Sequence, residues 1–538
     1  MSTLSAPPPP LANPPASPAP AGAGRRRVLA ALAIFLVLLT VYQTLVLTVV
    51  TDDVIRKGIE ADEYDMIWVN VAWGVAILYS VFGAFWLAAR YGMRITLAWG
   101  LAFFALGSLL LGAAVDLTST IAARFVEGIG KGLTIAVGRS TLYKQFDRLL
   151  LVAIGFYGVC AYATRPSTPL VTAYVNDWLS WRWIYWVNVP LALAGLLAVL
   201  RYIRPDRPPK PAHVPVDWLA LSTFIAWVVC LLFAFGWYRK WGGWSSDAFA
   251  AVVILCVTLP VVLVIWLGSG FSPDEHLRRL LRSRVYVLSM MVRVLLLFNL
   301  AAVLTIVGKY LIELRNDPRV VAGWVMVPAS LTMAASTLLT TVFHRRKLRH
   351  AWLVAGVVGA SACLWWLAGI DNFTAKEHVA LVLACWGASI GLFPPVFLTD
   401  EVEGLNPKDL IYAGSLAIVG LIVPLLTIPT MTGTVIKAWS DRALDVYRAN
   451  LSENRPPVAE AGARVADYYR QRGLAGAELQ RETATVLGTF AAAESIAVGF
   501  RQGFRFLSLI VLGLGLTVAI LLSRAARGLR APPGAGYS

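Results

Sequence analysis

Long apolar segments recur along almost the whole chain and alternate with short polar loops. Each segment is about twenty residues long, the length at which a helix crosses the hydrocarbon core of a bilayer. We predict fourteen such spans, with the ranges 28–50, 66–88, 95–115, 119–138, 149–173, 183–203, 215–236, 248–268, 286–312, 320–342, 351–370, 378–398, 410–436 and 504–523. The pattern therefore predicts an all-α polytopic membrane protein.

The composition excludes several other classes of protein. Of the 538 residues, 58% are hydrophobic and only 14% are charged, whereas a soluble protein carries about 25% charged residues. The mean hydropathy is +0.67. A soluble chain of this length would divide into several domains joined by polar linkers. The sequence is therefore not that of a soluble enzyme, a fibre or a disordered protein.

The net charge of +16 could indicate a nucleic-acid partner, so the placement of the basic residues decides its meaning. With the N-terminus inside, the inner tails and loops hold 24 of the 47 Lys and Arg residues, and the short outer loops hold eight. Basic residues concentrate on the cytoplasmic side of membrane proteins. We therefore expect both termini to be cytoplasmic, and we expect no nucleic-acid partner.

The spans group as six, two and six. We expect five parts: a disordered, Pro/Ala-rich cytoplasmic tail (1–24), a six-helix bundle (25–205), a linker with two extra transmembrane helices (206–284), a second six-helix bundle (285–525) and a cytoplasmic tail (526–538). Within the second bundle, 437–503 is a long extracytoplasmic loop. Its apolar spacing predicts two or three amphipathic helices, broken near 453–457 and 472–476. The loop is either a connector lying on the surface or a docking site for a partner.

Six charged side chains lie more than two residues inside the ends of the predicted spans: Arg124, Glu127, Lys131, Arg165, Arg293 and Lys309. A charge at mid-bilayer costs on the order of 2.5–3.5 kcal/mol, so it commonly marks a pathway or a pairing. Arg124, Glu127 and Lys131 lie within about a 60° arc of one helix face. The neighbouring residues Gly128 and Gly132 would let another helix approach closely.

Two interpretations of that face remain open. Either Glu127 binds and releases a proton in an aqueous cavity, or it is a permanent counter-ion between two bases. We expect Arg165, which is too deep to reach either surface, to line the cavity. We expect Arg293 and Lys309, which lie nearer span ends, to snorkel towards the surface. The excess of bases favours an anionic or amphipathic substrate.

No stretch of the sequence matches a complete enzyme motif. The stretch 127–134 resembles a phosphate loop, but Phe125 replaces its first Gly and Gly132 its Ser/Thr. The five cysteines all lie inside spans, without metal-ligand spacing. We therefore expect no enzymatic activity, no cofactor and no metal site. Without a nucleotide site, an ion gradient is the expected source of energy.

Several stretches together resemble one known family. They are LSWRWIYWVNVPLALAGLLAV (179–199) entering the sixth span, the inner-loop residues Arg90, Gly92 and Arg94, the fourth-span stretch 124–130, and 322–328. They resemble the major facilitator superfamily, in particular its fourteen-helix drug:proton antiporter branch (EmrB/QacA type). The resemblance implies the major-facilitator fold, with two six-helix bundles plus two extra helices. It also implies that Arg90, Gly92 and Arg94 form a gating motif and that Arg124 takes part in proton coupling.

The chain departs from this family's pattern at informative positions. The inner-loop motif has Ala89 where an Asp is usual, and Tyr42 stands where the first span carries an acid. The antiporter motif of the fifth span keeps only Pro169. Glu127 stands where Gln is common. We hypothesise that Glu127 took over proton coupling, and that Tyr42 belongs to the same cavity.

The expected function is therefore proton-coupled multidrug efflux, an antiport that exports small organic compounds such as drugs across the bacterial inner membrane. The expected partners are the substrate, protons and the lipid bilayer. The resemblance also implies a periplasmic adaptor (membrane fusion) protein. Two alternatives are kept: export of a dedicated metabolite or siderophore, and a non-transporting membrane sensor or scaffold of the same fold.

Overall fold

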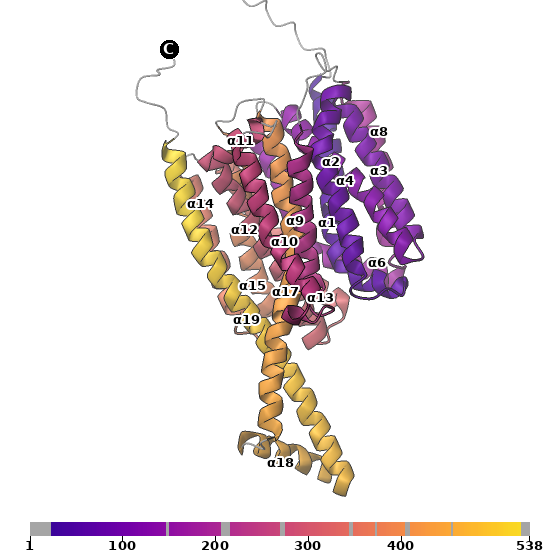
Figure 1. The fold of residues 1–538 in the computed structure, drawn as a ribbon, viewed down its shortest axis with the longest axis vertical. Coiled ribbons are helices and arrows are strands. Elements are labelled where there is room, and N and C mark those ends of the chain that lie inside the picture. The colour runs from indigo at the N-terminus through magenta and orange to yellow at the C-terminus, as the bar shows by residue number, and fades with distance from the viewer. Residues whose placement is uncertain are drawn as a thin grey trace, which may run out of the picture.

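The structure is a computed structural model, and it describes residues 23–146, 150–205, 216–269, 275–343, 348–371, 374–403, 409–452 and 456–528. Most of the predicted tail 1–24 lies outside these ranges. Within them every regular element is helical (Figure 1). The α-helices are α1 (Ala23–Gly58), α2 (Met66–Tyr91), α3 (Met93–Ala113), α4 (Leu117–Phe146), α5 (Leu150–Gly158), α6 (Thr168–Trp178), α7 (Trp183–Trp186), α8 (Asn188–Tyr202), α9 (Trp218–Gly236), α10 (Asp247–Ser269), α11 (Glu275–Arg282), α12 (Arg284–Lys309), α13 (Arg319–Val342), α14 (Arg349–Leu367), α15 (Lys376–Ile390), α16 (Phe393–Asp400), α17 (Asp409–Ser452), α18 (Pro456–Arg470) and α19 (Gly476–Gly528). Short π or 3₁₀ turns are η2 (Val159–Ala163), η3 (Arg165–Ser167), η4 (Gly243–Ser245) and η5 (Tyr310–Leu314).

The helices form two bundles that stand side by side in Figure 1. In the first, α4 packs against α2 and α3. In the second, α13 packs against α15, and α19 packs against α14 and α17. The bundles meet where α5, η2, η3 and α6 contact α13, and where α2 contacts α17. The extra helices α9 and α10 pack on each other, and α9 also contacts α2 and α17.

Twelve helices of the described chain are long and apolar enough to cross a membrane. The predicted spans 119–138 and 149–173 do not meet this criterion. The first lies within α4, a 30-residue helix whose mean hydropathy is lowered by its charged side chains. The second is interrupted, because η2 and η3 separate α5 from α6.

Two prolines account for the interruption between α5 and α6. Pro166 lies in η3 and Pro169 in the first turn of α6, where the missing backbone N–H of proline is tolerated. The break leaves Arg165 at the start of η3, buried between the bundles. The local sequence thus places a cation at an irregular point of the backbone.

The segment 437–503 forms a helical extension. The predicted break near 472–476 lies directly before α19, whereas the predicted break near 453–457 falls mostly outside the described residues. Gly473 and Gly476 have φ of +89° and +60°, which explains the break before α19. However, α17 and α19 run unbroken from the bundles into the extension, which projects away along the long axis (Figure 1). The segment therefore projects from the second bundle instead of packing along its helices.

The opposite end of the molecule is rich in arginine. It carries α11 and the ends of the helices that hold Arg90, Arg94, Arg201 and Arg349 (Figure 1). This end is called the basic end below, and the end with α18 is called the extension end.

Candidate functional site

The three charges predicted on the fourth span form a buried ion triad on α4. Glu127 lies 3.1 Å from Nη1 of Arg124 and 3.0 Å from Nζ of Lys131. None of the three side chains is exposed. Their spacing along the helix places both cations against one carboxylate, as the sequence predicts.

Helices α1, α2, α3 and α7 close around this triad. Arg124 donates to the hydroxyl of Tyr185 at 2.8 Å, and Lys131 donates to the carbonyl of Thr44 at 3.0 Å. The ammonium group of Lys131 also lies 5.4 Å from the ring centre of Trp73. Such contacts compensate part of the cost of burying a cation.

Glycines permit this close packing. A Cβ on Gly128 of α4 would lie 2.8 Å from the backbone oxygen of Trp73 on α2. A Cβ on Gly132 would lie 2.7 Å from the backbone oxygen of Ile77, also on α2. The sequence prediction of a close helix approach is confirmed. On the other side, a Cβ on Gly107 of α3 would lie 2.3 Å from the backbone nitrogen of Glu127. The carboxylate therefore sits where three helices are nearly in backbone contact.

A fourth charge, which the sequence reasoning missed, extends the triad. Asp52 of α1 is half-buried and lies close enough to Arg124 to interact with it electrostatically. The order Asp52, Arg124, Glu127, Lys131 is then a row of alternating charges, called the charge row below. In this conformation Glu127 is the counter-ion of two cations, while Arg124 has a second acid nearby.

A second buried cluster joins the two bundles nearer the basic end. Glu401, which directly follows α16, accepts a hydrogen bond from Nε of Arg293 at 2.8 Å and another from its Nη2. Arg293 also donates to the hydroxyl of Tyr162 in η2, and Arg139 of α4 lies 3.7 Å from Glu401. Arg293 and Glu401 belong to the second bundle, and Arg139 and Tyr162 to the first. We call these four residues the inter-bundle cluster.

The inter-bundle cluster overturns one prediction from the sequence. Arg293 does not snorkel to the surface, because its guanidinium is fully buried against Glu401. The hydropathy pattern places Glu401 in a loop, because this residue follows the predicted span 378–398. An informative signal was the acid pair Asp400–Glu401 at the basic end. Lys309, by contrast, lies exposed at the end of α12.

Arg165 and Tyr42 lie together, apart from the triad. Tyr42 shares a 2.8 Å hydrogen bond with Tyr157, and both hydroxyls interact electrostatically with Arg165. Nε of Arg165 donates to the carbonyl of Ala161 at 2.7 Å. Its buried Nη2 has no hydrogen-bond partner among the described residues. The result is a buried cation between α1 and α13 with an unused donor.

The inner-loop motif forms the turn between α2 and α3 at the basic end. Gly92 has a φ of +91° and links α2 to α3, a turn that favours glycine. Arg94 donates to the carbonyl of Leu200 on α8, while Arg90 lies 5.7 Å from the ring centre of Trp86. These contacts stay within the first bundle.

Pro169 marks a close contact between the bundles. The next residue, Leu170, lies so near Gly323 of α13 that a Cβ there would be 2.6 Å from its Cα. The antiporter-motif remnant therefore sits at a helix crossing between the bundles.

The charges and the two-bundle architecture agree with a match to a family model. The family described as "Major Facilitator Superfamily" matches residues 28–413, which is more than half of the chain. The chain belongs to the major facilitator superfamily. As a member of this family, it is a multi-pass membrane transporter with a small-molecule substrate, and it is not an enzyme.

Several proteins with similar sequences carry multidrug export or multidrug resistance in their names. Multidrug export protein EmrB of Haemophilus influenzae is 22% identical over 456 residues, which cover 84% of this chain and 87% of that protein. EmrB of Escherichia coli K12 is 22% identical over 72% of this chain and 75% of its own length. Multidrug resistance protein 3 of Bacillus subtilis is 20% identical over 63% of this chain and 66% of its own.

Solved structures support the fold alone. An auto-inhibited peptide transporter of the POT family has a TM-score of 0.53 and 14% identity, over 96% of this chain and 99% of its own. A bacterial homologue of the lysosomal transporter Spinster has a TM-score of 0.54 and 13% identity, over 95% and 99%. The all-helical major-facilitator fold is therefore shown.

Proposed function

We propose that this protein is a proton-coupled exporter of small organic compounds. It belongs to the fourteen-span drug:proton antiporter branch and acts in the bacterial inner membrane. The observation that carries the proposal is the charge row, which buries a carboxylate at mid-helix in a member of a transporter family. The relatives named as multidrug exporters support the same function.

The proposed topology adds two spans to the twelve apolar helices. They are α4 and the interrupted segment from α5 to α6, both of which pack within the bundles. The basic end then faces the cytoplasm together with both termini, in keeping with the concentration of arginine there. The extension end faces the periplasm.

Glu127 is the proposed proton-binding group. When it is protonated, Arg124 keeps Asp52 as an acid nearby, so only Lys131 loses its ion pair. Asp52 is half-buried on the extension-end side of the row and gives protons a polar approach from outside. Protonation of Glu127 thus changes the net charge of the row by one unit, and a change of charge between helices biases the equilibrium between two arrangements of the bundles.

The inter-bundle cluster is the proposed lock of the cytoplasmic side. In a rocking cycle the two bundles must separate first at one end and then at the other. The family's inner-loop charge pair lacks its acid here, because Ala89 stands in that position. Glu401 supplies an acid between the bundles instead, and Phe85 packs near Gly414 of α17 close to it.

Arg165 is the proposed contact for an anionic group of the substrate. Its buried, unused Nη2 and the hydroxyls of Tyr42 and Tyr157 suit a carboxylate.

Replacing Arg165 by Gln is expected to raise the KM for carboxylate-bearing substrates about tenfold, the cost of one charged hydrogen bond, with partial recovery in Arg165→Lys. Transport by purified protein in liposomes measures this. Lys309→Gln is the matched control, and a preference of the wild type for lipophilic cations would contradict the assignment.

The function itself is tested by flux. Cells that produce the protein are expected to accumulate less of a lipophilic carboxylate dye than cells without it, and a protonophore should abolish the difference. A panel that includes siderophores separates drug export from export of a dedicated metabolite. A sensor or scaffold would produce no difference in accumulation for any compound, which would overturn the proposal.

A periplasmic adaptor protein is the proposed partner of the extension. Val446 of α17 and Phe490 of α19 are 60% and 69% exposed there. Exposed apolar side chains on projecting helices are suited to packing against a partner's helices.

A further inference from the structure

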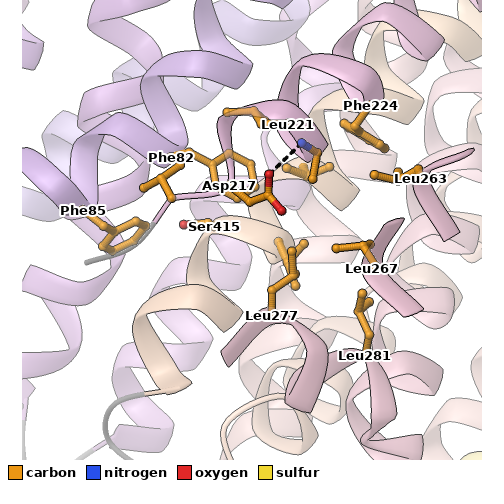
Figure 2. Close-up of a pocket in the computed structure, with 14 residues that line it drawn as sticks. Phe82, Phe85, Asp217, Leu221, Phe224, Leu263, Leu267, Leu277, Leu281 and Ser415 are labelled. Carbon is orange, nitrogen blue, oxygen red and sulfur yellow. Dashed lines mark hydrogen bonds between the residues drawn. The ribbon is translucent and has the colours of Figure 1, made fainter. Parts of the chain in front are cut away.

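A cavity of about 210 Å³ lies outside both charge clusters, at the basic end. Figure 2 shows its walls, which come from α2, α9, α10, α11 and α17. The two extra helices thus enclose it together with one helix from each bundle. It is not part of the interface where α5 and α6 meet α13.

The lining of this cavity is almost wholly apolar. Phenylalanine and leucine side chains dominate, among them Phe82, Phe224, Leu263 and Leu267. Among the described residues of the lining, Asp217 supplies the one carboxylate, and both its oxygens are engaged. Its Oδ1 accepts from the backbone N–H of Ala220 at 2.9 Å, and its Oδ2 accepts from Nε1 of Trp266 at 2.8 Å. The cavity is therefore built for an apolar ligand and offers little to a cation.

The cavity lies beside the lipid-facing surface. Helix α10, which forms one wall, packs mainly on α9 and leaves most of its other side uncovered. Val264 and Ile265 on it are 69% and 64% exposed. An apolar chain could therefore reach the cavity from the bilayer.

A short amphipathic helix borders the cavity with basic charge. Leu277 and Leu281 of α11 line the cavity, one turn apart. Arg278 and Arg282, also one turn apart, lie on a neighbouring face, and Arg279 pairs with Glu275. Nε of Arg278 is buried and has no hydrogen-bond partner among the described residues.

We propose that this cavity binds an acyl chain of an anionic phospholipid, with the headgroup phosphate held by Arg278 and Arg282 of α11. The apolar walls take the chain, and the arginines select for negative charge. The site shares no residue with either charge cluster.

The test is lipid retention by the purified full-length chain, read by native mass spectrometry from mixed micelles of phosphatidylglycerol and phosphatidylcholine. The wild type is expected to retain phosphatidylglycerol about tenfold better than phosphatidylcholine. The double variant Arg278→Gln/Arg282→Gln should lose the preference, and Ala220→Phe, which fills the cavity, should lose retention of both lipids. The matched control is Arg201→Gln, an exposed arginine at the same end.

Glycerol phosphate, the headgroup without a chain, should not compete. Competition by it would show a free-phosphate site and overturn the proposal. Equal retention of both lipids by the wild type, or unchanged retention in the arginine variant, would also overturn it. Melting curves in detergent identify a variant that fails to fold, and Leu267→Phe is the second cavity-filling variant.

Discussion

Replacing Glu127 by Gln is expected to abolish proton-driven transport and to lower the free energy of unfolding by about 3 kcal/mol. The variant fixes the row in the charge state of the protonated carboxyl, so the cycle cannot alternate. It also leaves Lys131, which is fully buried, without its ion pair at 3.0 Å. Transport driven by a pH gradient in liposomes and thermal melting in detergent measure the two effects.

Lys131→Met is the informative companion to Glu127→Gln. It removes the same ion pair but leaves Glu127 paired with Arg124 at 3.1 Å. Because a nearby cation favours the ionised carboxylate, its removal should move the pH profile of transport to higher pH while some coupling persists. If Glu127→Gln kept gradient-driven transport, Glu127 would be a structural counter-ion only.

Replacing Glu401 by Gln is expected to open the basic end. Glu401 is the common counter-ion of Arg293 and Arg139, both buried and from opposite bundles. Without its charge, the two guanidinium groups repel each other across the interface. Breaking a buried ion pair in this way costs about 3 kcal/mol, so the open arrangement should gain more than a hundredfold in population. Labelling rates of cysteines introduced along the interface would report this change.

Glu403→Gln is the matched control for Glu401→Gln. Glu403 pairs with Arg349, which also belongs to the second bundle. This variant should leave the labelling rates at the wild-type level. Tyr162→Phe, which removes one hydrogen bond across the interface, should give a smaller shift of about fivefold. Equal effects of Glu401→Gln and Glu403→Gln would contradict the lock.

The sequence predicts the fold well because hydrophobic length is a local signal. The apolar runs locate the helices, and the spacing of Arg124, Glu127 and Lys131 places them on one face, where the structure finds them paired. The glycines beside them predict the close contact with α2. These features depend on one helix at a time.

Partners from distant parts of the chain could not be predicted in the same way. Arg293 and Glu401 are 108 positions apart, and their pairing depends on how α12 packs against α16. The apolar run predicts that Asp52 lies in a loop, but α1 continues to Gly58 and brings Asp52 towards Arg124. In both cases a helix extends past the end of its apolar run. Hydropathy therefore placed the acid outside the membrane core.

The central claim is that a proton on Glu127 shifts the equilibrium between the two arrangements of the bundles. Distances between spin labels on α8 at Arg201 and beside α14 at Leu348, measured in acidic and in alkaline buffer, test it most directly. The wild-type distance distribution is expected to change with pH. Glu127→Gln should keep the acidic distribution in both buffers. A Glu127→Gln protein whose distances respond to pH as the wild type does would contradict it.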